Sequence, residues 1–137
     1  MSCWKILNEN TIDCNADNIL LLDDEIDIVA LFTLALKRQG FHVDGFTEPL
    51  LALERFRKNF DKYGLVVSDL RMPVMNGCQF IKQVKEIKPQ VKIFAMSAFD
   101  SDYVEFRTEL HLHIDEFIEK PILLSDFIRT VSIHINS

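Results

Sequence analysis

Short apolar runs alternate with longer amphipathic stretches along most of the chain. The first run, Ile19–Leu22, is apolar at every position and stops at Asp23, which is typical of a strand buried on both faces. A helical stretch follows from Glu25 to Gln39 and is ended by Gly40. The same order repeats four more times, with further strands expected over residues 41–46, 65–69, 91–96 and 114–118.

In the first two expected helices, as in later ones, the spacing assigns an inward face residue by residue. In the first helix, the residues expected to face the core are Ile26, Val29, Thr33 and Leu36. In the second, we expect Thr47 to cap the helix, with Pro49 in its first turn. The residues of that helix expected to point inward are Leu50, Leu53 and Phe56.

Five strand–helix alternations predict a parallel sheet covered by helices on both faces. For a chain of 137 residues, the expected architecture is α/β, a flavodoxin-like (βα)5 sandwich of three layers with strand order 2-1-3-4-5. The fourth helix should lie between Asp100 and His113, where the periodicity is least clear. Residues 18–137 form the predicted domain, and residues 1–17 are expected to be a flexible extension.

Composition narrows the classes of function. The net charge of −6 argues against direct binding to nucleic acid. No stretch is apolar for long enough to span a membrane, and the N-terminus lacks the core of a signal peptide, so we expect a soluble, cytoplasmic protein. The three scattered cysteines lack metal-ligand spacing and are interpreted as reduced thiols.

Polar residues follow the expected strands where each one ends. Asp23 and Asp24 end the first strand, Asp69 the third, Ser97 the fourth and Lys120 the fifth. Because ligands bind at the carboxyl ends of parallel strands, these residues should surround one pocket. Converging carboxylates repel each other unless a cation joins them, and an all-oxygen site suits Mg²⁺. Taken singly, each is an ordinary helix-capping, turn or surface residue, but their conjunction on one sheet edge favours a site.

Four motifs in this order resemble the receiver family of response regulators in two-component signalling, over about residues 18 to 135. The motifs are Leu-Leu-Asp23-Asp24-Glu25, Val-Val-Ser-Asp69-Leu-Arg-Met-Pro73-Val-Met-Asn-Gly77, Met-Ser97-Ala98 and Phe117-Ile-Glu-Lys120-Pro121.

The resemblance implies a phosphoacceptor and its metal site. Asp69 is then the nucleophile that takes a phosphoryl group from a phosphohistidine of a sensor kinase or histidine phosphotransfer protein. Asp23, Asp24 and Asp69 would hold Mg²⁺ together with the backbone carbonyl of Arg71. Phosphoryl transfer needs positioning and charge neutralisation, which this set of residues can provide.

The resemblance also implies a switch. Ser97 and Lys120 would bond to the phosphoryl oxygens, and Phe117 would swing inward once Ser97 has moved, although a plain core role for Phe117 is nearly as good. The response would alter the surface of the fourth helix, fifth strand and fifth helix, which would bind an unknown effector protein or support a phosphorylation-dependent dimer. The chain would be no enzyme beyond accepting and losing its own phosphoryl group.

Four residues depart from the family pattern or add to it. Bulky His113-Ile114 stand where the family keeps a small Gly-Ala pair, so the surface that binds the effector should be repacked. Arg71 and Phe99 flank the expected pocket, each two residues after a site residue. We hypothesise that Phe99 screens the path of an attacking water while Arg71 lies against the phosphoryl group, which would give a long-lived acyl phosphate.

Other functions remain open from the sequence. With the last helix ending near residue 135, we expect a stand-alone module, and a phosphorelay intermediate is the main alternative. A phosphatase of the haloacid dehalogenase type also uses an aspartate nucleophile, but it places that residue after the first strand in an Asp-x-Asp arrangement. A pseudo-receiver that only binds is disfavoured by the intact Asp69, Ser97 and Lys120.

Overall fold

A computed structural model describes residues 18–98 and 114–136 of the chain. Its core is one sheet of five parallel strands in the order β2-β1-β3-β4-β5, which confirms the predicted flavodoxin-like order. The strands are β1 (Asn18–Leu22), β2 (His42–Phe46), β3 (Tyr63–Asp69), β4 (Lys92–Ser97) and β5 (Glu116–Glu119).

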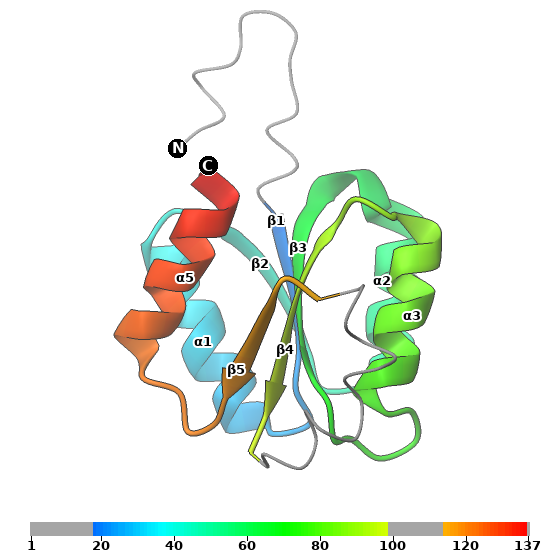
Figure 1. The fold of residues 1–137 in the computed structure, drawn as a ribbon, viewed down its shortest axis with the longest axis horizontal. Helices are drawn as coiled ribbons and strands as arrows, with labels where there is room; N and C mark the ends of the chain where they lie inside the picture. The colour runs from blue at the N-terminus through cyan, green and yellow to red at the C-terminus, as the bar shows by residue number, and fades with distance from the viewer. Residues whose placement is uncertain (1–17, 99–113, 137) are drawn as a thin grey trace, which may run out of the picture.

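Helices cover both faces of the sheet, so the molecule has the three layers expected (Figure 1). Helices α1 and α5 lie on one face, and α2 and α3 lie on the other. The helices are α1 (Ile26–Arg38), α2 (Pro49–Asn59), α3 (Gly77–Ile87) and α5 (Leu124–Asn136), with a 3-10 turn η3 (Phe60–Lys62). The expected fourth helix, Phe99, His113 and the extension 1–17 lie outside the described residues.

The start of β1 and the end of α5 lie at the same end of the sheet, opposite the end at which the strands finish (Figure 1). No helix within residues 18–98 or 114–136 is long and apolar enough to cross a membrane.

Strand β1 is buried on both faces, as its unbroken apolar run predicts. Leu20 and Leu22 pack in the core beneath α2 and α3, whereas Ile19 and Leu21 pack in the core beneath α1 and α5. Each such side chain contributes about 1.5–3 kcal/mol by leaving water. Because β1 is an interior strand, paired with β2 on one side and β3 on the other, this burial fixes the position of the residues that follow it.

Two predicted inward residues are wrong. Ile26 is 68% exposed, and the core side of α1 consists of Val29, Phe32 and Leu36. The error arises because α1 is apolar around most of its circumference, so hydrophobic spacing alone does not select one face. In α2, Leu50 is 55% exposed for the same kind of reason.

The predicted cap of α2 is also wrong. Its N-cap is Glu48 instead of Thr47, and no side chain caps the helix there. Pro49 explains the difference, because a proline fixes its own φ in the helical range and pushes the residue before it into an extended conformation. Glu48 is extended, with φ −117° and ψ 118°, so the helix begins at the proline.

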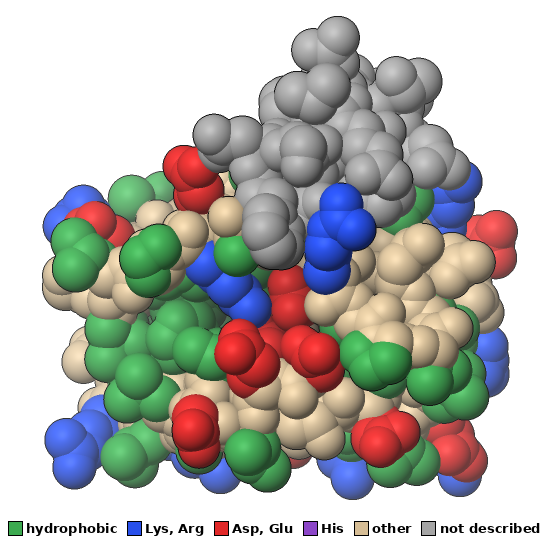
Figure 2. All heavy atoms as spheres, turned by 90° about the horizontal axis from the view of Figure 1, so that it is seen from below, with side chains coloured by type: hydrophobic (Ala, Val, Ile, Leu, Met, Phe, Trp, Pro, Cys, Tyr) green, Lys and Arg blue, Asp and Glu red, His purple; other side chains and the backbone are tan. Residues whose placement is uncertain are grey.

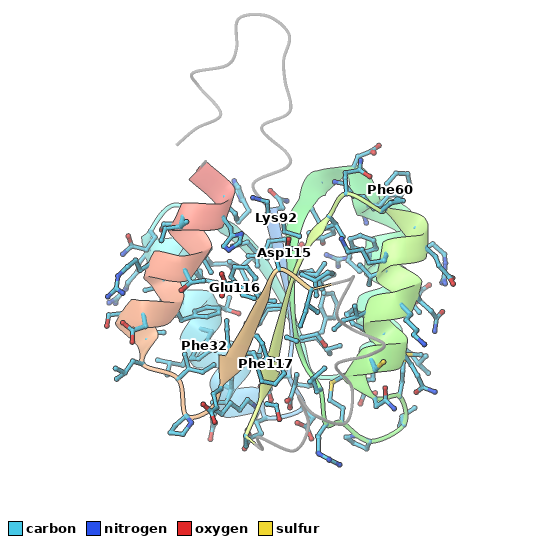
Figure 3. All side chains as sticks on the ribbon, viewed as in Figure 1. Phe32, Phe60, Lys92, Asp115, Glu116 and Phe117 are labelled. Atoms are coloured by element: carbon cyan, nitrogen blue, oxygen red, sulfur yellow. The ribbon has the colours of Figure 1, made fainter. Side chains whose placement is uncertain are left out.

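The fifth strand begins at Glu116, two residues later than predicted. Asp115 explains the shift, since its backbone N–H donates to the Ile93 carbonyl at 2.7 Å while its carboxylate accepts from the Ile93 N–H at 2.9 Å. The side chain therefore takes the place of a backbone acceptor in the ladder. Figure 3 shows Asp115 at the start of β5.

Candidate functional site

Three carboxylates meet where β1 and β3 end, at neighbouring positions in the sheet. Asp23 and Asp24 follow β1, and Asp69 is the last residue of β3. One oxygen from each lies within 4.8 Å of the others. Asp23 is fully buried and Asp69 is 5% exposed, whereas Asp24 faces solvent. Figure 2, a view of this end of the sheet, shows acidic side chains beside a basic one near the middle of the face.

Lys120 supplies a cation to this cluster. Its ammonium nitrogen lies 2.8 Å from Asp23 Oδ2, 3.4 Å from Asp69 Oδ2 and 3.6 Å from Glu25 Oε1. The lysine is placed by β4, because its backbone N–H donates to the Ser97 carbonyl at 2.7 Å. One partly buried ammonium thus contacts two buried carboxylates, and such charge-assisted contacts are strong.

The cluster changes the acidity of its members. Burial raises the pKa of Asp69 from 3.8 to about 6, and repulsion from Asp23 adds to the rise, while Lys120 opposes it. For Lys120, burial alone would lower the pKa, but the hydrogen bond to Asp23 and attraction to Asp69 outweigh it, so its pKa is raised. The site therefore has more negative charge than its single lysine neutralises.

Asp23 is held by contacts on two sides. Its backbone N–H donates to the Phe46 carbonyl at 3.1 Å, which ties it to the end of β2. Its Oδ1 accepts from the Glu25 N–H at 2.9 Å, so one carboxylate oxygen is occupied by the backbone. The other oxygen, Oδ2, is the one that receives the Lys120 hydrogen bond.

Gly77 positions Asp69 from the other side, a role that the sequence did not reveal. The Gly77 N–H donates to the Leu70 carbonyl at 3.0 Å, which brings the start of α3 against the end of β3. A Cβ on Gly77 would overlap the Asp69 carbonyl oxygen and lie 2.7 Å from Leu70 Cα. Only glycine permits this approach of two backbones.

Asn76 and Gln79 form a reciprocal capping box at the start of α3. The Gln79 N–H donates to Asn76 Oδ1 at 2.9 Å, and the Asn76 N–H donates to Gln79 Oε1 at 3.1 Å. This box fixes the chain immediately before Gly77.

Val74 lies in the same loop with a backbone that valine rarely adopts. Its φ is 72°, and the Met75 N–H donates to the Pro73 carbonyl at 2.8 Å, forming a three-residue turn. The Val74 side chain is 82% exposed. The strained turn therefore presents an apolar side chain to solvent close to the site.

The remaining predicted site residues lie on the neighbouring strands. Ser97 ends β4, is 1% exposed and directly follows Met96, the residue paired with Asp69 in the sheet. Phe117 lies on β5 opposite Ala95 and is partly buried against the core beneath α2 and α3 (Figure 3). Arg71 is exposed in the loop after Asp69. The structure thus brings Asp23, Asp24, Asp69, Ser97 and Lys120 to one sheet edge.

Large exposed apolar side chains surround this edge. Ile26 follows β1 and is 68% exposed, Val74 follows β3, and Leu123 follows β5 and is 68% exposed. The sequence carries a signal for this rim, namely apolar residues within five positions of the ends of β1, β3 and β5.

Comparison with known protein families shows the family to which the chain belongs. The sequence model of the response regulator receiver domain matches residues 19–132. The chain belongs to this family. It is therefore a receiver domain of a two-component signalling system, which confirms the resemblance drawn from the four strand-end motifs.

Relatives and solved structures agree with this assignment. The receiver protein CpdR of Brucella abortus is 32% identical over 81 residues, covering 59% of this chain and 66% of that protein. The CpxR homolog of Haemophilus influenzae is 29% identical over 103 residues, covering 75% of this chain but 43% of its own length. This chain thus spans less than two thirds of either relative.

Two structures illustrate the shared fold. A receiver domain protein from Clostridium thermocellum superimposes with a TM-score of 0.79 at 23% identity, covering 87% of this chain and 94% of that one. A CheY-like receiver from Methanospirillum hungatei gives 0.79 at 21% identity, covering 88% and 94%.

Receiver domains generally bind Mg²⁺ at an acidic pocket, and the residues present here suit that ion. Asp23, Asp24 and Asp69 offer hard oxygen donors within 4.8 Å of one another. Two of them are buried with one lysine for compensation, so a divalent cation would remove the remaining repulsion.

Proposed function

We propose that the chain is a phosphorylation switch in which Asp69 accepts a phosphoryl group. The supporting observation is the position of Lys120, which bridges Asp23 and Asp69 inside the acidic cluster. A lysine there can contact a phosphoryl group on Asp69 without leaving the site, because its nitrogen already lies 3.4 Å from Asp69 Oδ2.

In the proposed reaction, a carboxylate oxygen of Asp69 attacks the phosphorus of a phosphohistidine. The new P–O bond forms as the P–N bond breaks, and the electron pair of that bond leaves with the imidazole. The attack needs an ionised Asp69, and a pKa of about 6 leaves this carboxylate mostly ionised at neutral pH. The Lys120 ammonium offsets charge on the transferred group.

Asp23, Asp24 and Asp69, with the backbone carbonyl of Arg71, would hold the magnesium ion. When bound, Mg²⁺ neutralises negative charge on the carboxylates and on the phosphoryl oxygens. Asp23 is well placed for this role, because its backbone contacts to Phe46 and Glu25 hold it fixed.

The rim of exposed apolar residues supports a protein as the phosphoryl donor. Ile26, Val74 and Leu123 would pack against an apolar surface around the donor histidine. A sensor histidine kinase or a histidine phosphotransfer protein fits this description. We propose a cytoplasmic location for this chain, where the phosphohistidine of such a donor would reach it.

The readout is proposed to pass through Ser97 and Phe117. Ser97 lies at the end of β4, directly after Met96, the partner of Asp69 in the sheet, and would donate its hydroxyl hydrogen to a phosphoryl oxygen. Phe117 lies on the neighbouring strand and is only partly buried, so it is not locked within the core. The resulting change would alter the surface of β5 and α5 that an effector protein, or a second phosphorylated copy, recognises.

A relay intermediate, which passes the phosphoryl group to another histidine, uses the same chemistry and is kept as the second candidate. The lifetime of the acyl phosphate separates the two, and exposed Arg71 is proposed to lengthen it by lying against the phosphoryl group. A dehalogenase-type phosphatase is less consistent, because Asp69 follows β3 instead of β1.

Intact-mass measurement after incubation with acetyl phosphate and Mg²⁺ tests the proposal. We expect one phosphoryl mass gain in the parent chain and none in Asp69→Asn, with Asp115→Asn as a matched control that still gains it. Absence of a gain in a folded parent chain, with acetyl phosphate and with a panel of sensor kinases, would overturn the proposal.

A further inference from the structure

The outer face of α1 has apolar residues at its centre and opposite charges at its two ends. Leu31 is 50% exposed and Leu34 is 53% exposed. Asp27 lies one turn before Leu31, Arg38 lies one turn after Leu34, and both are exposed. A surface helix usually presents polar residues at such central positions.

These four residues form one straight line on the helix. Their spacing is four, three and four residues, which is the alternation of a coiled-coil seam. The buried side of α1 is opposite, where Val29, Phe32 and Leu36 face the sheet. The line therefore points directly away from the domain and is available to a neighbouring helix.

The four residues of this line are complementary to the same four residues of a second, antiparallel α1 helix. When two α1 helices lie antiparallel about a two-fold axis between positions 32 and 33, Leu31 of one copy is opposite Leu34 of the other. The same axis places Asp27 opposite Arg38 of the other copy at both ends. Such a pairing is the isologous contact of a symmetric dimer, in which each residue meets the same partner twice.

Small residues flank the line on both sides, with Ala30 on one flank and Ala35 on the other. Alanines beside a helix–helix seam let the two backbones approach closely, so the leucines can interdigitate.

The charges identify a second copy of this chain as the partner. Among the residues that the structure describes, neither Asp27 nor Arg38 takes part in an ion pair within its own chain. Each is therefore available to a neighbour, and the order of charges along α1 fits the reverse of α1 itself.

We propose that the chain forms a weak antiparallel dimer through α1, with Leu31 and Leu34 at the centre of the contact and Asp27–Arg38 pairs at its ends. One helix of 13 residues on each side buries less than the roughly 1,000 Å² of a stable interface, so the dimer forms at high concentration. The contact does not involve Asp69 and is independent of phosphorylation, which distinguishes it from a dimer through β5 and α5.

Charge reversal with mixing is the decisive test. Asp27→Arg makes both ends of the line basic, and Arg38→Asp makes both ends acidic. Each variant alone should dimerise at least about tenfold more weakly than the parent chain, because like charges then meet at both ends. An equimolar mixture of the two should form a heterodimer, since every 27–38 pair is again of opposite sign.

Sedimentation velocity over about 10 μM to about 1 mM measures the association, a range that brackets a weak interface. Leu31→Asp should leave a monomer, whereas Leu51→Asp, on α2 and 56% exposed in the parent chain, should not change the association. Melting temperatures identify any variant that fails to fold. A parent chain that stays monomeric throughout, or a mixture that associates no better than either variant alone, would overturn the proposal.

Discussion

The ammonium nitrogen of Lys120 lies 2.8 Å from Asp23 Oδ2 and 3.4 Å from Asp69 Oδ2. One cation therefore serves two buried carboxylates, with the exposed Asp24 close by. Burial of Asp69, with repulsion from Asp23 added to it, raises the pKa of this carboxyl and makes the folded chain less stable than it would be with a neutral residue there.

Replacing Asp69 by asparagine should stabilise the fold at pH 7.5. Because the folded-state pKa of Asp69 is raised from 3.8 to about 6, folded Asp69 binds its proton more tightly, and stability falls as pH rises between these values. Asp69→Asn should therefore raise the free energy of unfolding by about 1–3 kcal/mol above pH 6 and by little below pH 4. Urea unfolding at several pH values measures this. An equal gain at every pH would contradict the titration argument, and exposed Asp126→Asn is the control.

Magnesium should stabilise the parent chain. An ion bound only by the folded state at one hundred times its dissociation constant adds about 2.7 kcal/mol. The gain should be smaller at pH 5, where Asp69 is mostly protonated, and smaller in Asp69→Asn and Asp24→Asn. Thermal melts with Mg²⁺ and with a chelator measure the effect. A shift that is the same in all three chains would place the ion elsewhere.

Removing the lysine should do the opposite of removing Asp69. Lys120→Met leaves two buried carboxylates without their cation. The free energy of unfolding should therefore fall by about 3 kcal/mol at pH 7.5. The loss should shrink at pH 5, because Asp69 then carries a proton. Phosphorylation by acetyl phosphate should slow as well. Lys58→Met, whose side chain is 70% exposed in the parent chain, is the matched control, and a comparable loss there would refute the assignment.

Gly77→Ala should damage the site although alanine normally favours a helix. The gain in helix propensity is about 1 kcal/mol, but the added Cβ would overlap the Asp69 carbonyl and press on Leu70. We expect a net loss of about 2 kcal/mol and slower labelling of Asp69. Gly40→Ala is the comparison, because a Cβ there meets nothing within 4 Å and only its φ of 95° is unfavourable. That variant should lose about 1 kcal/mol and label normally.

Val74→Asn should stabilise the chain by about 1 kcal/mol. A β-branched residue at φ 72° is strained, whereas asparagine tolerates that conformation. The same change removes an 82% exposed apolar side chain from the rim, so it should also weaken phosphotransfer from a protein donor but leave labelling by acetyl phosphate unchanged. Equal effects on both donors would show that Val74 acts on the site itself.

The sequence predicted the sheet and the polar residues of the acidic site, because both follow from short patterns along the chain. An unbroken apolar run such as Ile19–Leu22 is typical of an interior strand in a sheet that helices cover on both faces. Polar residues at strand ends follow from the same reasoning. Ile26 and Leu50 were misplaced because their helices carry apolar residues on several faces, so the inward face is set by packing.

The roles of Gly77 and Val74 could not be predicted, because they depend on contacts and backbone angles within one loop. Gly77 matters through the approach of two backbones, and spacing along the chain does not measure that approach. The N-cap of α2, in contrast, could be predicted from the sequence. Pro49 favours an extended conformation for the residue before it, which makes Glu48 the N-cap instead of Thr47.

Strand β1 begins and α5 ends at the end of the sheet remote from Asp69 (Figure 1). A resin, a fluorophore or a fused polypeptide attached at either of these points would lie at the end of the domain opposite the acidic pocket. The pocket would therefore stay accessible. The same geometry lets a receiver be carried within longer proteins, such as the relatives that exceed it in length, without obstruction of its reactive edge.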